Sequence, residues 1–205
     1  MLHVFTAIWM LPRDSVYGGW PRSGEIDIME SKGNDNYAVG NGVQVGNTLV
    51  ASTLHCGQDA DHNDCWTAHW ERNIQGSGHS FADDFHLYGL TWTDNHIIFT
   101  VDNEETGDVW APENGIWYYR RFQNNPGGTN LSQDGNWMAP FVREFQIILN
   151  VAVGGTFFPD NIGNRPWSWD GHPMKDFWER RSEWLPTWHE EEAALQIDYV
   201  RVYQN

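Results

Sequence analysis

The chain has 205 residues, the length of one domain, and it is long enough to bury a hydrophobic core. Its 12 Lys and Arg against 28 Asp and Glu give a formal net charge of −16 at pH 7, which argues against nucleic acid and membrane surfaces as partners, because both require a basic face. The sequence contains no apolar run near the roughly 18 residues that a membrane helix needs.

Period-two runs rich in β-branched and aromatic residues recur along the chain and predict an all-β fold. The runs 87–92 and 96–101 are predicted to form a hairpin. A short helix is expected only at 175–183, and the Trp- and Pro-rich stretches 123–140 and 156–194 are expected to be long loops that carry function or cap a groove. Without an internal repeat or a linker, the chain is predicted to form one β-sandwich. The predicted strands are 4–11, 25–31, 38–46, 50–56, 85–93, 96–102, 116–122, 144–153 and 195–203.

The aromatic content is unusually high, with 13 Trp, 10 Phe and 7 Tyr. A large core would account for part of this content, but Trp is rarely buried completely, and the number exceeds what one core needs. Exposed flat rings suit the apolar faces of pyranose sugars, so the composition indicates a carbohydrate partner.

The segment 24–31 carries three acidic residues in a predicted strand. Glu25 and Asp27 are two residues apart and share one face, while Ile26 and Ile28 point to the other face. In a regular strand Glu30 would point with the isoleucines. A β-bulge at 28–29 would return Glu30 to the face of the other two acids, and bulges re-aim side chains in this way near active sites.

A solvated acidic face, or pairing with the nearby Arg13, Arg22 or Lys32, would be the structural alternative for these acids. Three like charges on one face repel, however, and clustering raises carboxyl pKa values toward those of an acid/base catalyst. Glycoside hydrolysis with retention of configuration requires two carboxyl groups about 5–5.5 Å apart, one as nucleophile and one as proton donor. Glu25 and Glu30 fit these two roles, and Asp27 between them can hydrogen-bond either one.

This acidic segment resembles the signature of glycoside hydrolase family 16, in the bulged form typical of its β-1,3-glucanases (laminarinases). Other segments are similar to the same family, and those near the C-terminus resemble its animal branch, which contains both active glucanases and β-1,3-glucan recognition proteins that do not catalyse. The segments that carry the resemblance are 7–12, 17–21, 24–30, 52–55, 88–92, 148–155, 177–188 and 198–203.

The resemblance implies a β-jelly-roll sandwich of the concanavalin A-like lectin/glucanase type. It implies Glu25 as the nucleophile, Glu30 as the acid/base and Asp27 as the assisting acid. The family also implies that Trp9 and Trp20 stack sugars in a cleft, although each could be a core residue. His55 matches a histidine beside the catalytic strand, and Arg22 could bond a sugar hydroxyl or form a salt bridge.

Cys56 and Cys65 are nine residues apart and would form a disulfide in a secreted protein or remain free thiols in the cytosol. The nearby histidines do not match a common zinc spacing. Family members commonly carry an aromatic residue where Cys56 stands, and with the secretory family this departure is interpreted as a local disulfide in an extracellular protein. The resemblance implies no cofactor for catalysis and a possible structural calcium, whose aspartate Asp198 matches.

Only six residues precede the segment 7–9, whereas family members carry several strands before the matching position. The expectation is therefore a single family 16 domain over 1–205, truncated at its N-terminus. Its expected function, as a monomer, is retaining endo-hydrolysis of β-1,3-glucan. The alternatives are a glucan recognition module that does not cleave, or the same chemistry on mixed-linkage glucan, agar or a transglycosylation acceptor.

Overall fold

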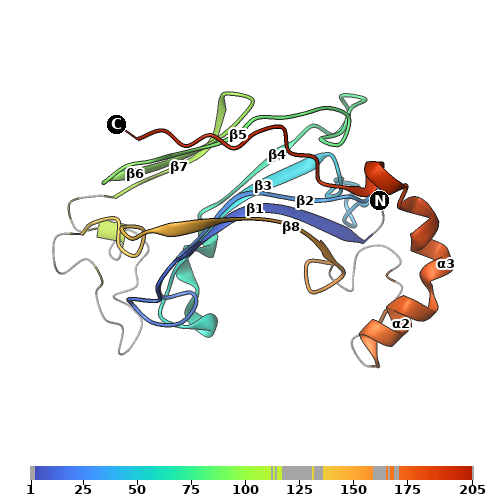
Figure 1. The fold of residues 1–205 in the computed structure, drawn as a ribbon, viewed down its shortest axis with the longest axis horizontal. Coiled ribbons are helices and arrows are strands. Elements are labelled where there is room, and N and C mark those ends of the chain that lie inside the picture. The colour runs from blue at the N-terminus through green and yellow to red at the C-terminus, as the bar shows by residue number, and fades with distance from the viewer. Residues whose placement is uncertain are drawn as a thin grey trace.

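A computed structural model describes residues 3–111, 113, 115–116, 131, 136–158, 165, 167–168 and 171–204. Its strands form two antiparallel sheets that lie one above the other (Figure 1). The five-stranded sheet has the order β4-β3-β2-β1-β8, and the three-stranded sheet has the order β5-β6-β7. The strands are β1 (Val4–Pro12), β2 (Glu25–Lys32), β3 (Leu49–His55), β4 (His69–Asn73), β5 (Tyr88–Trp92), β6 (His96–Val101), β7 (Glu104–Trp110) and β8 (Phe145–Val153).

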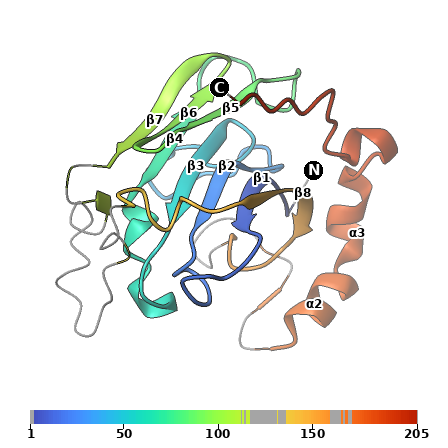
Figure 2. The same cartoon turned by 60° about the vertical axis from the view of Figure 1, so that its left-hand side comes forward.

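Helices occupy a small part of the described chain, and α2 and α3 lie at one side of the sheets (Figure 2). No helix among the described residues is long and apolar enough to cross a membrane. The helices are η1 (Ala60–His62), η2 (Asp64–Thr67), α2 (Pro173–Glu179), α3 (Arg181–Trp184), η4 (Leu185–Thr187) and η5 (Glu190–Ala193), of which those labelled η are 3-10 helices.

The main core lies between the two sheets. Ile26 of β2 and Leu54 of β3 contribute to it from the five-stranded sheet, and Ile97 and Phe99 of β6 contribute from the three-stranded sheet. All four side chains are at most 1% exposed. The face of the five-stranded sheet that carries Ile26 therefore points inward, and its opposite face points away from the three-stranded sheet.

Most of the predicted strands are confirmed to within a few residues, and the predicted hairpin is β5–β6, in which Leu90 faces Phe99. The helix predicted at 175–183 corresponds to α2 and α3.

Two strand predictions were wrong. The segment 38–46 makes only the isolated bridge Ala38↔Gln44, because most of its residues turn in a loop. The segment 195–203 runs extended beside the three-stranded sheet but forms no ladder with the described residues, and its alternating side chains remain largely exposed (Figure 1). The predicted strand 116–122 lies almost wholly outside the described residues, and Ile116 itself belongs to a helical turn.

Strands β4 and β7 were not predicted from the sequence. Both are short and polar, with the sequences HWERN and EETGDVW, and their pairing with β3 and β6 overrides this weak local preference. A turn signal did precede β7. Asp102 and Asn103 both have positive φ, at 54° and 66°, as the two central residues of a type I′ hairpin turn require.

Candidate active site

A β-bulge in β2 places Glu30 on the same face as Glu25 and Asp27, as predicted. Asp27 pairs with Trp9 of β1, and Glu30 pairs with Ala7, two residues along the same strand. Because Trp9 and Ala7 share a face of β1, Asp27 and Glu30 share the corresponding face of β2. The register shift falls between Asp27 and Glu30, where one additional residue of β2 enters the ladder with β3. We call this outward face of the five-stranded sheet the carboxylate face.

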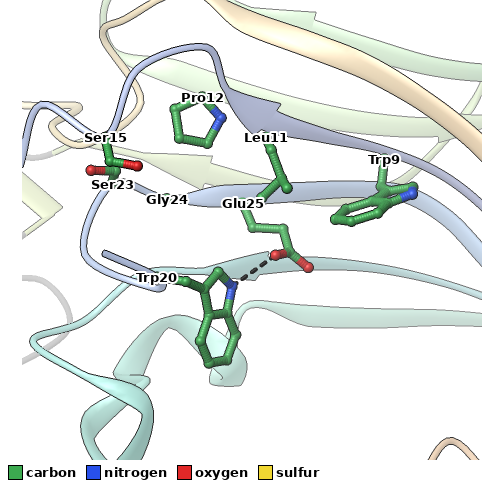
Figure 3. Close-up of a pocket in the computed structure, with 8 residues that line it drawn as sticks. All are labelled: Trp9, Leu11, Pro12, Ser15, Trp20, Ser23, Gly24 and Glu25. Carbon is green, nitrogen blue, oxygen red and sulfur yellow. Dashed lines mark hydrogen bonds between the residues drawn. The ribbon is translucent and has the colours of Figure 1, made fainter. Parts of the chain in front are cut away.

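The loop before β2 brings Trp20 to the first carboxylate. The indole Nε1–H of Trp20 donates a hydrogen bond of 2.7 Å to Oε2 of Glu25 (Figure 3). Gly24 directs the chain into the strand with φ +88°, and a Cβ at this position would lie 3.0 Å from the ring of Phe141. A side chain there would be strained by both its φ and its contact. Trp9, Trp20 and Glu25 line a pocket of about 430 Å³.

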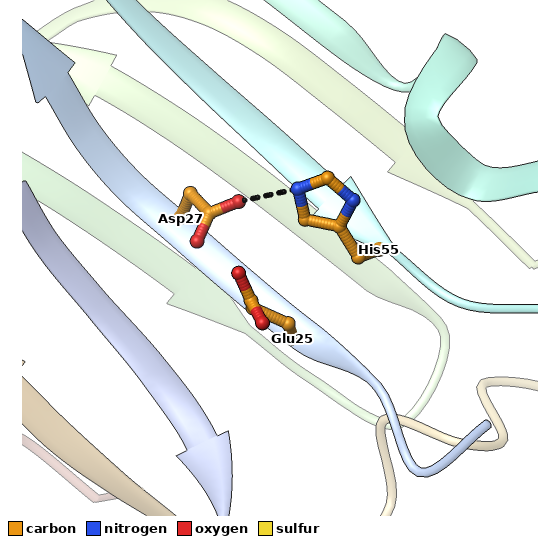
Figure 4. A group of neighbouring side chains, drawn as sticks. All are labelled: Glu25, Asp27 and His55. Atoms are coloured by element: carbon orange, nitrogen blue, oxygen red, sulfur yellow. Dashed lines mark ion pairs between the residues drawn. The ribbon is translucent and has the colours of Figure 1, made fainter. Parts of the chain in front are cut away.

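His55 at the end of β3 faces the second carboxylate. Its Nε2 lies 3.1 Å from Oδ2 of Asp27, and Figure 4 shows this pair beside Glu25. A metal ion could be bound by one ligand atom from each of Glu25, Asp27 and His55, because these atoms lie within 4.8 Å of one another. The carboxylates and the imidazole already interact with one another, and a shared proton network accounts for the cluster without a metal.

All three acids have raised pKa values, which fits an acid/base site. Burial is the largest cause of the raised pKa of Glu25, and the negative charge of Asp27 adds to it. Burial also raises the pKa of Asp27. For Glu30, burial acts first, and the charges of Asp27 and Glu25 raise its pKa further. The group therefore retains protons at pH values where isolated carboxyl groups have lost them.

Trp9, the second predicted sugar-stacking residue, lies on the carboxylate face beside Asp27. Its Nε1–H donates a hydrogen bond of 2.6 Å to Oδ1 of Asn150 in β8, and this bond fixes the orientation of the indole. Trp9 is partly buried, whereas Trp20 is 49% exposed. The two indoles flank Glu25 in the pocket.

Of the basic residues named as possible partners of the acids, Lys32 lowers the pKa of Glu30 against the larger effect of burial, whereas Arg13 and Arg22 have other contacts. Arg13 forms ion pairs with Asp14 and Glu144. The side chain of Arg22 packs close to Gly18, and Arg22 is not among the residues that line the pocket. Its predicted contact with a sugar hydroxyl stays a prediction.

The structure joins Cys56 and Cys65 in a disulfide, as predicted, with their Cα atoms 4.9 Å apart. Both residues are 1% exposed and belong to the main core. Asp198 is exposed in the extended segment near the C-terminus, and no metal-ligand cluster of described residues includes it. The structural calcium stays a prediction.

Sequence reasoning missed two side chains that contact the site, Asn150 and Asn63. Asn150 carried a signal, because it is the only polar residue in the centre of the apolar run 147–153. Asn63 approaches His55 from the loop closed by the disulfide, and its sequence gave no sign of this contact. Lys32, two residues beyond Glu30, lies with its Nζ 4.0 Å from the ring centroid of Phe157, and burial lowers the pKa of Lys32.

Comparison with protein families and sequences gives consistent results. The family model described as glycosyl hydrolases family 16 matches residues 4–119. A β-1,3-glucan-binding protein of Penaeus monodon is 43% identical, over 98% of this chain and 55% of the relative. A glucan endo-1,3-β-glucosidase A1 of Niallia circulans is 32% identical, over 98% of this chain and 22% of the relative. The chain thus spans about half the length, or less, of these curated relatives.

Solved structures show the same fold. The catalytic domain of an endo-1,3-β-glucanase (laminarinase) from Thermotoga petrophila matches with a TM-score of 0.51 and 23% identity, over 76% of this chain and 49% of that one. An endo-β-1,3-glucanase from Pyrococcus furiosus matches with a TM-score of 0.51 and 23% identity, over 84% of this chain and 51% of that one. The two antiparallel sheets thus have the arrangement of a β-jelly-roll sandwich.

Proposed function

The chain belongs to the glycosyl hydrolases of family 16, and on this premise we propose that it binds β-1,3-glucan on the carboxylate face and hydrolyses it with retention of configuration. The observation that carries this proposal is the bulged strand β2, which presents Glu25, Asp27 and Glu30 on one face. A strand selected for stability alone would not gather three partly desolvated acids there.

The surroundings of the two glutamates support different roles for them. Trp20 donates a hydrogen bond to Glu25, which favours its carboxylate form, as a nucleophile requires. The charges of Asp27 and Glu25 favour the protonated form of Glu30, as a general acid requires. In the proposed reaction Glu25 attacks the anomeric carbon, and Glu30 gives its proton to the leaving glycosidic oxygen.

The second half of the reaction uses the same residues in reverse. Glu30, now ionised, accepts a proton from water, and the resulting hydroxyl oxygen attacks the anomeric carbon and releases Glu25. Asp27 lies between the two glutamates and can share a proton with Glu25 as charge moves through the site. The sugar ring would be held in the pocket that Trp9 and Trp20 flank.

Binding without cleavage is the second candidate function. The name of the relative from Penaeus monodon, a β-1,3-glucan-binding protein at 43% identity, favours this alternative. The presence of all three acids favours hydrolysis. Both candidates share a β-1,3-glucan ligand and differ only in whether the carboxylates act on it.

The deciding experiment pairs binding with product analysis on the same preparation. The protein is incubated with laminarin, mixed-linkage β-glucan and agarose, and its binding to an insoluble β-1,3-glucan is measured by sedimentation. Short oligosaccharides with initially β-configured reducing ends from laminarin would support a retaining endo-glucanase. Sedimentation with the glucan but no new reducing ends would support the binding function. A protein that neither sediments with the glucan nor releases reducing ends would reject both candidate functions.

We also propose that the protein acts outside the cell as a monomer. The disulfide supports an extracellular location, because such bonds persist in oxidising compartments. A structural calcium would be tested by adding EGTA during thermal unfolding of the purified protein.

A further inference from the structure

His55 is held between two side chains from different parts of the chain. Its Nε2 faces Oδ2 of Asp27 at 3.1 Å, and its Nδ1 faces Nδ2 of Asn63 at 2.6 Å. Asp27 belongs to the carboxylate face, whereas Asn63 belongs to the loop between β3 and β4. The imidazole therefore connects the proposed catalytic acids to this loop.

The donor and acceptor properties of the two partners select one form of the imidazole. The amide nitrogen of Asn63 can only donate, so Nδ1 of His55 must accept and carry no proton. Whenever the carboxyl group of Asp27 is ionised it can only accept, so Nε2 must then carry the proton. A proton on Nδ1 would set two N–H groups against each other at 2.6 Å. Both contacts are satisfied only by the neutral tautomer with its proton on Nε2.

We propose that Asn63 is a positioning residue, whose amide fixes the tautomer of His55 so that the Nε2 proton of the imidazole is directed at Asp27. The contact is made by Nδ2 of Asn63, and the Oδ1 of the same amide is buried without a hydrogen-bond partner among the described residues. Among the described residues, the side-chain amide of Asn63 is thus held by its hydrogen bond to His55.

The loop that carries Asn63 is built to hold this position. The disulfide between Cys56 and Cys65 closes it, and the N–H of Cys65 donates to the carbonyl of Cys56 at 3.0 Å. Gly57 allows close packing inside the loop, because a Cβ there would lie 1.8 Å from the carbonyl oxygen of His62. Both cysteines are buried in the main core, which anchors the loop to the sandwich.

The catalytic consequence of this arrangement rests on the proposed function. A proton held on Nε2 stabilises the ionised form of Asp27, because the polarised N–H lies 3.1 Å from Oδ2 of this carboxylate, an oxygen that has no hydrogen-bond partner among the described residues. The charge of Asp27 in turn raises the pKa of Glu30 and of Glu25. Asn63 would thus act on the acids through two intermediate groups without touching the substrate.

The test uses two variants that change the donor with little change in shape. Asn63→Asp replaces the amide with an isosteric carboxylate, which can only accept and should draw a proton onto Nδ1. Asn63→Ala removes the contact and should leave a mixture of tautomers. Asp61→Ala is the matched control, because Asp61 is exposed in η1 of the same loop.

The primary measurement is the ¹⁵N NMR spectrum of histidine-labelled protein near neutral pH, with the His55 signals assigned from a His55→Phe sample. We expect a protonated Nε2 and an unprotonated Nδ1 in the parent protein and in Asp61→Ala, and a protonated Nδ1 in Asn63→Asp. An imidazolium in the parent protein, or an unchanged tautomer in both Asn63 variants, would overturn the proposal. Near-UV circular dichroism verifies folding, and Asn63→Ala serves if the aspartate variant does not fold.

The second measurement is laminarin hydrolysis. Loss of the partner that orients a metal-bound histidine typically costs about 10–100-fold in activity, and by analogy we expect kcat to fall by about 10-fold or more in Asn63→Asp, with KM changed less than about twofold. Normal kcat and an unshifted pH profile in both Asn63 variants would overturn the catalytic part. If the parent protein does not cleave laminarin, the proposed function fails, and the NMR result still decides whether Asn63 sets the tautomer.

Discussion

Glu25 and Glu30 carry the same carboxyl group on the same strand, but the protein surrounds them differently. The indole of Trp20 donates to Glu25, and His55 beside it lowers the pKa of Glu25 against the larger effects of burial and Asp27. Glu30 faces the negative charges of Asp27 and Glu25. Burial raises the pKa of both glutamates, but only Glu25 receives the hydrogen bond from Trp20 that favours its ionised form, which fits the division of labour in retaining glycoside hydrolysis.

We expect Glu25→Gln and Glu30→Gln each to reduce laminarin hydrolysis by about 10²–10⁴-fold while glucan binding is retained. The amide keeps the shape of the side chain but can act neither as a nucleophile nor as a proton donor. Initial rates and sedimentation with insoluble β-1,3-glucan measure the two properties separately. More than about a tenth of the parent activity in either variant would contradict the role assigned to that glutamate.

The raised pKa of Glu30 also affects stability, with a definite sign. A carboxyl group with a raised pKa in the folded state holds its proton more tightly there than in the unfolded chain. Its contribution to the free energy of unfolding is fully present below the ordinary glutamate pKa and is lost as the pH rises through the pKa of the folded state. The free energy of unfolding of Glu30→Gln should therefore exceed that of the parent at alkaline pH, by about 1.4 kcal/mol per unit of pKa shift removed, and the variant should melt at a higher temperature.

Thermal unfolding of both proteins from about pH 4 to about pH 9 tests this expectation. The two melting curves should be closest at the acid end, where Glu30 is protonated in both states, and should separate as the pH rises. A difference that shrank with rising pH would mean that the folded protein favours the charged form of Glu30. The exposed Asp61→Ala variant is the control for general charge effects.

At the scale of the element, the bulge in β2 decides where Glu30 points. Deletion of Ile28 would remove the additional residue, and Glu30, then two residues after Asp27 in a regular strand, would still point to the carboxylate face. We expect the folded deletion variant to retain part of its laminarin hydrolysis and to lose about 0.5–3 kcal/mol of its free energy of unfolding, because Ile28 no longer packs against the main core and Ser52 loses its hydrogen bond to the Ile28 carbonyl.

Ile28→Val is the matched control for the deletion, since it keeps the bulge and removes one methylene at a cost of about 0.5–1.5 kcal/mol. Denaturant unfolding and laminarin hydrolysis are measured on both variants. A folded deletion variant with no measurable hydrolysis would contradict this expectation and would show that the additional residue sets the position of Glu30 along the strand and not only its face. The hydrogen bond from Ser52 Oγ to the carbonyl of Ile28, at 2.8 Å, stabilises the bulge in the parent protein.

The disulfide-closed loop is the second element whose contribution can be measured. Replacing Cys56 and Cys65 together by alanine should lower the free energy of unfolding by about 2–3 kcal/mol through the loss of loop-closure entropy. Reduced parent protein is the control and should approach the variant. Two titratable thiols in denatured, unreduced protein would show that the bond does not form.

Local sequence patterns predicted the site better than the edges of the sheets. The spacing of Glu25, Asp27 and Glu30, with the isoleucines between them, determines both the face and the bulge, because strand periodicity is local. The missing ladder of 195–203 among the described residues and the strand character of β4 depend on distant residues that no local pattern identifies. Asn63 meets His55 only because the chain folds back between two cysteines.

At the scale of the whole molecule, the two sheets cover one another unevenly. Four alternate residues of β8 pair with the inward side of β1, yet they are between 37% and 46% exposed. The extended segment 195–203 adds further exposed apolar side chains, among them Tyr199 and Val202. Exposed apolar surface of this kind promotes association or dye binding. The exposed residues of β8 are Ile147, Leu149, Val151 and Val153.

We expect the chain to bind the hydrophobic dye ANS through this exposed face of β8. Replacing Val151 and Val153 together by threonine should reduce dye fluorescence and aggregation, because threonine keeps the branched shape and the strand preference while adding a polar group. The free energy of unfolding should change by less than about 0.5 kcal/mol, since both positions are solvent-exposed.

Val109→Thr is the matched control, because Val109 is 2% exposed in the main core and the same change should cost about 1–3 kcal/mol there. Equal destabilisation at the two places would mean that β8 is covered in solution, and unchanged dye fluorescence in the double variant would place the dye-binding surface elsewhere.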